Sequence, residues 1–161
     1  MGVVENHLEI VSCLPPEKIF KAFVLEADFL LPKIVPHIFE SCDVLEGDGG
    51  PGTLKKITFA EGSKFKHAKH RVDLIDKEKF IYHYTWVEGE LLSLHHYEKI
   101  SYEVKIECGP DGGSIFKNNT KYHTRGDIHI AEEELKEDNE KIFGLFKAIE
   151  GHVLAHPESY Y

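Results

Sequence analysis

Apolar and polar residues alternate along much of the chain, and this period of two predicts β-strands. The first predicted strand spans residues 3–13. Short connectors rich in glycine, proline and charged residues separate the later strands, as at 109–113, which indicates an antiparallel meander. Six of these strands follow one another, with predicted bounds of 38–45, 53–59, 64–75, 80–87, 95–107 and 114–123.

Between the first two strands the apolar residues are spaced by three and four positions, which predicts short helices. Pro15 and Pro16 fit the start of a helix that is expected to continue to about residue 25. A second short helix is expected at 28–33, ended by Pro32 and Pro36, because proline interrupts helical hydrogen bonding. Both helices are too short to form the crossover that joins parallel strands.

A long helix is predicted near the end of the chain, from about residue 132 to residue 155. Three consecutive glutamates begin it, where the helix dipole favours acidic side chains. Its apolar residues recur at steps of three, four or seven, which predicts one apolar face. That face consists of Leu135, Ile142, Phe146, Ile149 and Val153, and it is widened by Phe143, Leu145 and Leu154.

These elements predict an α+β fold in a single ligand-binding domain that spans residues 1–161. Their order is one strand, two short helices, a meander of six strands and a long helix. A strongly curved, seven-stranded antiparallel sheet wrapped around the C-terminal helix satisfies that order.

The net charge of −9 disfavours nucleic acid as a partner, because phosphate backbones are bound mainly by lysine and arginine. The first residues lack the charged and apolar regions of a secretory signal, and no segment is apolar enough for a membrane span. We therefore expect a cytoplasmic protein. Cys13, Cys42 and Cys108 are widely spaced and odd in number, and we expect free thiols in a reducing compartment.

A glycine-rich segment has the spacing G-x-G-x-x-G of a phosphate-binding loop. Nucleotide-binding loops of this kind open a helix, whose free N–H groups hold the phosphate. Here residues 53–59 predict a strand instead, and the lysine of a P-loop does not follow the last glycine. We therefore expect a loop between two strands, with its glycines at Gly47, Gly49, Gly50 and Gly52.

The same segment, Glu-Gly-Asp-Gly-Gly-Pro-Gly-Thr at 46–53, is followed by Lys-Lys-Ile at 55–57. Together they closely resemble the signature of the class-10 pathogenesis-related proteins of plants, the family of the major birch pollen allergen. The likeness continues at 98–101 (Glu-Lys-Ile-Ser), 111–114 (Asp-Gly-Gly-Ser) and 121–124 (Lys-Tyr-His-Thr), and it covers the whole chain. The resemblance implies a helix-grip fold with a large internal cavity between the sheet and the long helix.

Tyr82 and Tyr84 are two positions apart in a predicted strand, so their side chains are expected on one face. Two hydroxyls that face an interior suit amphiphilic ring ligands. The resemblance implies that these tyrosines line the cavity together with Lys55 and Tyr102. It also implies that Asp28 pairs with Lys55, and that His67 and His70 face inward. The expected ligand-binding residues are Lys55, Asp28, Phe59, His70, Tyr82, Tyr84, Tyr102 and Phe143.

The function that these observations favour is that of an intracellular, defence-related plant protein that carries amphiphilic small molecules. Flavonoids, cytokinins and sterol-like hormones are the expected ligand classes. We expect a monomer without a cofactor. We also expect no metal site, because the eleven histidines show no metal-ligand spacing with cysteine or carboxylate residues.

Two other functions stay open. The family resemblance implies a ribonuclease or lyase-type enzyme as one alternative, in which Lys55, Glu98 and Glu150 are the matching catalytic positions. His152 stands where the family has a tyrosine, and histidine also serves in acid–base catalysis. The other alternative is a regulator of a phosphatase that resembles the hormone receptors of abscisic acid signalling, although the chain has no gate motif of that kind.

Overall fold

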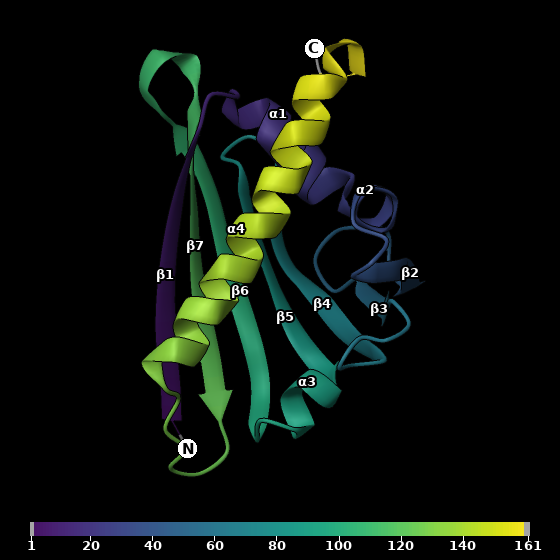
Figure 1. The fold of residues 1–161 in the computed structure, drawn as a ribbon, viewed down its shortest axis with the longest axis vertical. Helices are drawn as coiled ribbons and strands as arrows, with labels where there is room; N and C mark the ends of the chain where they lie inside the picture. Colours follow the sequence, from purple (N-terminus) through teal and green to yellow (C-terminus); the bar gives the residue numbers. More distant parts are fainter. Residues whose placement is uncertain (1, 160–161) are drawn as a thin grey trace.

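In the computed structural model, which describes residues 2–159, a seven-stranded antiparallel sheet curves around one long helix (Figure 1). This helix, α4 (Glu132–Ala155), crosses one face of the sheet. It begins near the N-terminal end of the first strand and ends near the short helices that follow that strand. The predicted α+β, helix-grip architecture is therefore confirmed.

The strands are joined along the chain as hairpins, except that the first strand pairs with the last. The resulting order across the sheet is β1-β7-β6-β5-β4-β3-β2. All seven predicted strands are present, and their ends differ from the predicted ends by three residues at most. Their bounds are β1 Gly2–Ser12, β2 Phe39–Glu46, β3 Leu54–Phe59, β4 His67–Asp76, β5 Ile81–Gly89, β6 Tyr97–Cys108 and β7 Ser114–Thr124.

The two predicted short helices are also present. The first, α1 (Pro16–Phe20), continues directly into a π-helical turn, η1 (Lys21–Leu25), and α2 (Ala27–Ile34) follows. Pro32 was expected to end the second helix, but it lies inside α2. Its missing N–H leaves the carbonyl of Asp28 without its usual helical partner, and the helix tolerates this because it ends soon afterwards.

A four-residue helix, α3 (Glu90–Ser93), lies in the connector between β5 and β6, where no helix was expected. It begins after Gly89, whose φ of 138° belongs to a region that other residues rarely adopt. A side chain at this position would also place its Cβ 2.7 Å from the Cβ of Ala68 on the neighbouring strand. Glycine therefore lets β5 end in close contact with β4, and Leu92 of α3 is then buried. Two short 3₁₀ turns, η2 (Pro110–Gly112) and η3 (Pro157–Ser159), complete the fold.

The glycine-rich loop joins β2 to β3, as predicted, and it precedes a strand rather than a helix. The Thr53 hydroxyl accepts a hydrogen bond from the Gly49 N–H at 2.8 Å, and the Asp48 carboxylate accepts one from the Gly50 N–H at 3.0 Å. A Cβ at Gly47 would lie 2.6 Å from the Thr53 Oγ1. Two of the loop N–H groups that a phosphate would need are therefore already engaged by the loop itself.

The core lies between the C-terminal half of α4 and the adjacent sheet and short helices. Phe116 of β7 contacts Phe146 of α4, with ring centroids 5.0 Å apart. The buried residues of α4 are Phe146, Ile149 and Val153, all in its second half. Phe143 and Leu154 were expected to widen this face, but they are 45% and 53% exposed. The first half of α4 therefore crosses the sheet with few buried apolar contacts.

Candidate functional site

Strands β3 to β6 place polar and aromatic side chains on the face of the sheet that α4 covers. The register pairs Lys55 of β3 with His70 of β4, and it pairs Tyr84 of β5 with Tyr102 of β6. Tyr82 lies two residues before Tyr84 and faces the same side. Five residues predicted for the ligand site thus lie together on the inner face of the sheet.

The aromatic rings of this group form a continuous wall. Tyr84 and Tyr102 are stacked, with centroids 4.8 Å apart and an interplanar angle of 13°. Tyr82 lies 5.1 Å from Tyr84 on the same strand. The imidazole of His70 lies 5.0 Å from the Tyr84 ring and 5.2 Å from the Trp86 ring. Ring faces at these separations present the apolar, polarisable surface on which another ring stacks.

An ion pair closes one side of the wall. The Lys55 ammonium lies 2.9 Å from the carboxylate of Asp28, which stands in the first turn of α2. The structure therefore pairs these two residues as the family resemblance implied.

Nearby, burial raises the pKa of the Cys42 thiol to about 12, with a further contribution from the negative charge of Asp28. Cys42 is consequently a neutral thiol, and together with Cys13 and Cys108 it is free of disulfides.

His70 is buried, with 8% of its surface exposed, and neither ring nitrogen has a hydrogen-bond partner among the described residues. Burial, together with a smaller contribution from the positive charge of Lys55, lowers its pKa to about 3. The imidazole is therefore neutral near pH 7, with one N–H donor and one bare nitrogen that accepts. Neither nitrogen has a hydrogen-bond partner among the described residues, which is uncommon for buried polar atoms.

The three tyrosines remain protonated over the physiological range, because burial raises the pKa of Tyr82, Tyr84 and Tyr102 above that of free tyrosine. Tyr82 is only 7% exposed. Tyr84 and Tyr102, although deep in the fold, keep an intermediate accessible surface. The wall therefore offers phenolic O–H groups and ring faces that are not fully covered by other side chains.

Two other predicted residues differ in where they lie. Phe59 extends the wall, since its ring centroid is 6.5 Å from that of Trp86. Phe143 lies apart from it, on an exposed part of α4. His67 was expected to face inward with His70, but it is exposed. The reason is that residues three positions apart in a strand point to opposite faces.

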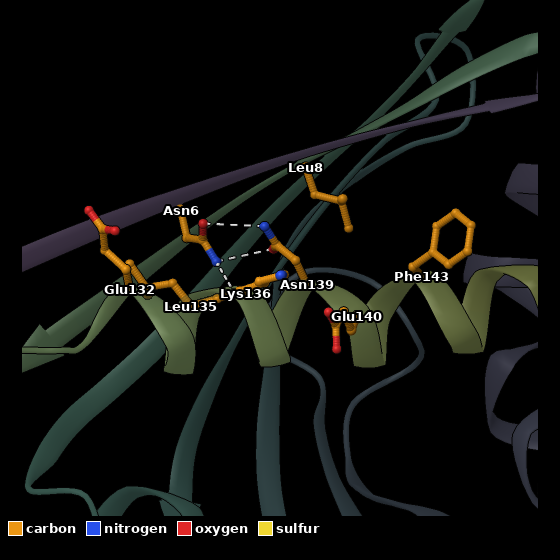
Figure 2. Close-up of a pocket in the computed structure, with 8 residues that line it drawn as sticks. All are labelled: Asn6, Leu8, Glu132, Leu135, Lys136, Asn139, Glu140 and Phe143. Carbon is orange, nitrogen blue, oxygen red and sulfur yellow. Dashed lines mark hydrogen bonds between the residues drawn. The ribbon is translucent and has the colours of Figure 1, made fainter.

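A pocket of about 610 Å³ lies between β1 and α4, away from the aromatic wall (Figure 2). Asn6 and Asn139 face each other across it and exchange two hydrogen bonds, of 3.1 and 3.3 Å. The Asn6 amide also donates to the Leu135 carbonyl at 2.9 Å. Leu8 and Phe143 provide apolar surface beside this pair. The sequence analysis missed the pocket, because isolated asparagines carry no signal of a pairing across the fold.

The residues of the alternative enzyme site are engaged in separate places. Lys55 belongs to the ion pair under α2, and Glu98 is exposed on β6. Glu150 accepts a hydrogen bond of 2.6 Å from the Ser12 hydroxyl at the end of β1. His152 lies on the last turns of α4, where burial lowers its pKa. The four side chains therefore make separate contacts and do not form one acid–base arrangement.

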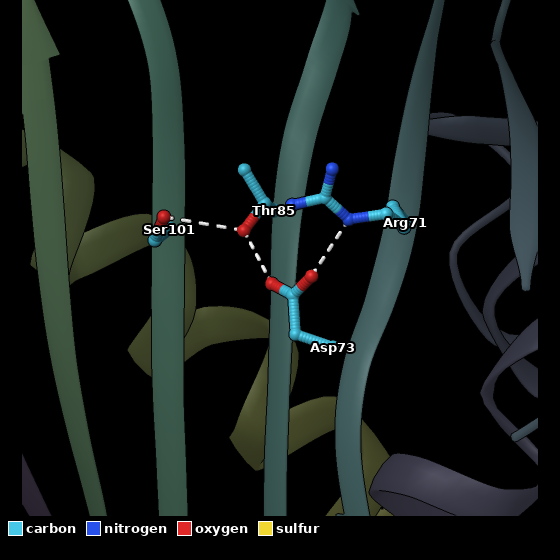
Figure 3. Close-up of polar contacts among 4 residues, drawn as sticks. All are labelled: Arg71, Asp73, Thr85 and Ser101. Atoms are coloured by element: carbon cyan, nitrogen blue, oxygen red, sulfur yellow. Dashed lines mark hydrogen bonds and ion pairs between the residues drawn. The ribbon is translucent and has the colours of Figure 1, made fainter. Parts of the chain in front are cut away.

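On the outer face, a polar network fixes the strands that carry the wall (Figure 3). Thr85 lies between Tyr84 and Trp86 in β5 but points the other way, and it is 2% exposed. Its hydroxyl donates to the Asp73 carboxylate at 2.5 Å, and Arg71 donates to the other oxygen at 2.8 Å. A further contact of 3.2 Å to Ser101 links β6. These hydrogen bonds on the outer face therefore join β4, β5 and β6, the strands that carry the aromatic side chains on the inner face.

Within residues 2–159, no group of three or more histidine, cysteine or acidic side chains is placed to hold a metal ion. The described helices also include none that combines the length and apolar character needed to cross a membrane.

The model of the pathogenesis-related protein Bet v 1 family matches residues 1–156. The major allergen Pru ar 1 of Prunus armeniaca is 51% identical over 160 residues, which cover 99% of each chain. The major allergen Pru av 1 of Prunus avium shows the same identity and the same coverage.

Solved structures agree on the fold. The crystal structure of Ara h 8.0201 superposes with a TM-score of 0.85 at 40% identity, covering 96% of this chain and 99% of that one. Norcoclaurine synthase from Thalictrum flavum superposes with a TM-score of 0.74 at 22% identity, covering 96% of this chain and 88% of the enzyme. At that identity the likeness to the enzyme concerns the fold alone.

Proposed function

The chain belongs to the pathogenesis-related protein Bet v 1 family, and on that premise we propose that it binds amphiphilic small molecules. The proposed site is an internal cavity between the inner face of the sheet and α4. The ligand classes are flavonoids, cytokinins and sterol-like hormones, which combine a ring system with a few polar groups. The protein acts as a defence-related carrier and catalyses no reaction.

The observation that carries this proposal is the aromatic wall on β4 to β6. Tyr84 and Tyr102 lie deep in the fold and yet keep accessible surface. Accessible surface at that depth faces inward, where a ring ligand can cover it. Burying about 150 Å² of apolar ligand surface in this way is worth roughly 4 kcal/mol before the costs of association.

Polar groups around the wall orient the ligand. The hydroxyls of Tyr82, Tyr84 and Tyr102 are protonated donors, and the Lys55–Asp28 pair supplies charge at the α2 side. A few polar groups within an otherwise apolar lining are typical of small-molecule sites. Phe59 adds apolar surface beside Trp86. Phe143, which was also expected to bind the ligand, lines the separate pocket between β1 and α4 and lies outside the proposed site.

We further propose that residues 1–161 act as one ligand-binding domain and as a monomer in the cytoplasm of plant cells. The three cysteines are free, which suits a reducing compartment.

The emission of Trp86 tests the proposal. It is the only tryptophan of the chain, and it lies in the wall beside His70. Titration with one member of each ligand class should change this emission saturably for at least one of them. Isothermal calorimetry of the same mixtures provides an independent measure of the affinity.

The matched variants are Tyr84→Leu, which removes a ring from the wall, and His123→Leu on the outer face of β7. We expect weaker binding in the first variant and unchanged binding in the second. Absence of saturable binding of all three classes to the unmodified protein would overturn the proposed function.

A further inference from the structure

Two histidine rings lie next to each other at the C-terminal end of α4. His152 belongs to the last turns of the helix, and His156 is its C-terminal cap, four positions later. Residues at this spacing are neighbours on one side of a helix. The two ring centroids are 4.4 Å apart, with an interplanar angle of 30°. The end of α4 therefore presents two imidazoles side by side, near the short helices (Figure 1).

A hydrogen bond sets the tautomer of one of these rings. The Nδ1 atom of His156 lies 2.9 Å from the carbonyl oxygen of His152. A carbonyl oxygen only accepts a hydrogen bond, so Nδ1 carries the proton and donates it. In the neutral ring, Nε2 is then the bare nitrogen, with its lone pair available. Metal-binding histidines are commonly oriented by a backbone carbonyl in this way.

Both rings can be reached from solvent, and their surroundings tolerate a cation. His156 is exposed, and His152 is half-buried. Burial lowers the pKa of His152, so its neutral form predominates at pH 7. The positive charge of Lys33 and the negative charge of Glu26 act on this pKa in opposite directions, so the charge of Lys33 is partly offset.

We propose that His152 and His156 bind a divalent transition-metal ion, such as Zn²⁺ or Cu²⁺, through one nitrogen of each imidazole. Imidazole nitrogen suits both ions. An ion 2.0 to 2.1 Å from each nitrogen holds the two nitrogens about 3 Å apart. Rings whose centroids are 4.4 Å apart reach this separation by small side-chain rotations. Within residues 2–159, no third histidine, cysteine or acidic side chain completes the group, so water takes the remaining coordination positions.

The proposed site depends on the replacement of a tyrosine of the family by His152. A tyrosine there would be a poor ligand, because its hydroxyl stays protonated near pH 7. The expectation of no metal site concerned histidines combined with cysteine or carboxylate residues. Two histidines four positions apart on a helix are a different pattern, which is also typical of zinc ligands. The site lies apart from the aromatic wall and does not rest on the proposed function.

Isothermal calorimetry of Zn²⁺ binding to the full chain, without added histidines, tests the inference at pH 7.5. His152→Tyr and His156→Gln each leave one ligand, and His129→Gln, an exposed histidine before α4, is the matched control. We expect each of the first two variants to bind Zn²⁺ at least about tenfold more weakly, because the second nitrogen of a pair binds intramolecularly. The control should keep the affinity of the unmodified protein. Mg²⁺, which prefers oxygen ligands, should not displace the zinc.

Amide hydrogen exchange then locates the ion. Zn²⁺ bound to both rings links the cap to the preceding turn, so exchange in residues 150–156 should slow by at least about threefold at saturation. Exchange in residues 132–139 should not change, and His152→Tyr should show no slowing. Equal Zn²⁺ affinity of the unmodified protein and His152→Tyr would overturn the inference. No binding to the unmodified protein, or an equal loss in all three variants, would overturn it too, since His129 is not one of the pair.

Discussion

Tyr122 and His70 are both buried polar residues on the inner face of the sheet, but their surroundings differ. The Tyr122 hydroxyl donates to the Asp138 carboxylate at 2.6 Å, so its polar atom is satisfied. Neither nitrogen of His70 has such a partner. Buried polar groups are usually paired, so Tyr122 follows the general pattern and His70 departs from it.

Replacing Tyr122 by phenylalanine removes the hydrogen bond that ties β7 to α4. We expect the free energy of unfolding to fall by about 1 to 2 kcal/mol, because the acceptor is a carboxylate. Tyr97→Phe is the matched control, since its bond to Glu134 is long, at 3.5 Å. Urea denaturation measures both. Equal losses in the two variants would contradict this account.

The low pKa of His70 predicts a pH dependence of stability. Its pKa is about 3 in the folded protein and near its ordinary value of 6.5 in the unfolded chain, so the unfolded state binds more protons between these values. Stability due to this group is therefore complete above pH 6.5 and is lost as the pH falls toward 3. Relative to His70→Phe, the unmodified protein should lose about 2 to 3 kcal/mol between pH 7 and pH 4.5. Urea denaturation of both proteins at the two pH values measures this difference, and parallel pH profiles would show that His70 is not responsible.

At the scale of elements, polar contacts between strands and helices help to hold the helices over the sheet, and two of them can be tested separately. The Lys55–Asp28 ion pair joins β3 to α2. The Asn6–Asn139 pair joins β1 to the first half of α4, which has few buried apolar residues of its own. The first half of α4 is therefore the segment that we expect to move most readily for ligand entry, because it lacks the packed apolar contacts of the second half.

Asp28→Asn tests the first connection. It leaves the Lys55 ammonium, with 11% of its side chain exposed, without its carboxylate partner. We expect a loss of about 2 kcal/mol in the free energy of unfolding, less than for a fully buried pair because Asp28 is partly exposed. Adding Lys55→Met should recover most of the loss, since no buried charge then remains unpaired. A neutral single variant in urea denaturation would show that the pair contributes little.

Asn139→Ala tests the second connection. It removes the bonds of Asn139 to Asn6 and to the His7 carbonyl. Amide hydrogen exchange in residues 132–139 should become about tenfold faster, with no change in residues 146–153, which belong to the packed half. Lys136→Ala, an exposed neighbour, is the control. Uniformly faster exchange along α4 would indicate that its two halves open together.

At the scale of the whole molecule, periodicity predicted nearly all of the fold. Alternation of apolar and polar residues located every strand. In a strand with one covered face, every second side chain is covered, so apolar and polar residues alternate. The exceptions have local causes. Helix α3 follows a glycine whose role depends on contact with Ala68 of another strand. Pro32 is tolerated because α2 is short. Contacts between distant segments of this kind leave no periodic signal.

The candidate site was predictable only in part. Alternation placed Tyr82 and Tyr84 together, and the family resemblance supplied Lys55 with its partner Asp28. The prediction for His67 was wrong because it followed the resemblance. Alternation along the strand would have placed His67 and His70, three positions apart, on opposite faces. The Asn6–Asn139 pair was missed because such pairing depends on where α4 crosses β1, which one-dimensional patterns do not contain.

The central claim is that a ligand occupies the interior between the aromatic wall and α4. A crystal structure of the protein with bound 2-naphthol tests it most directly. We expect the ring to lie in the interior, in contact with the rings of Tyr84 and Tyr102. An interior filled by side chains, with the naphthol bound only between β1 and α4 or on the outer face, would contradict the account.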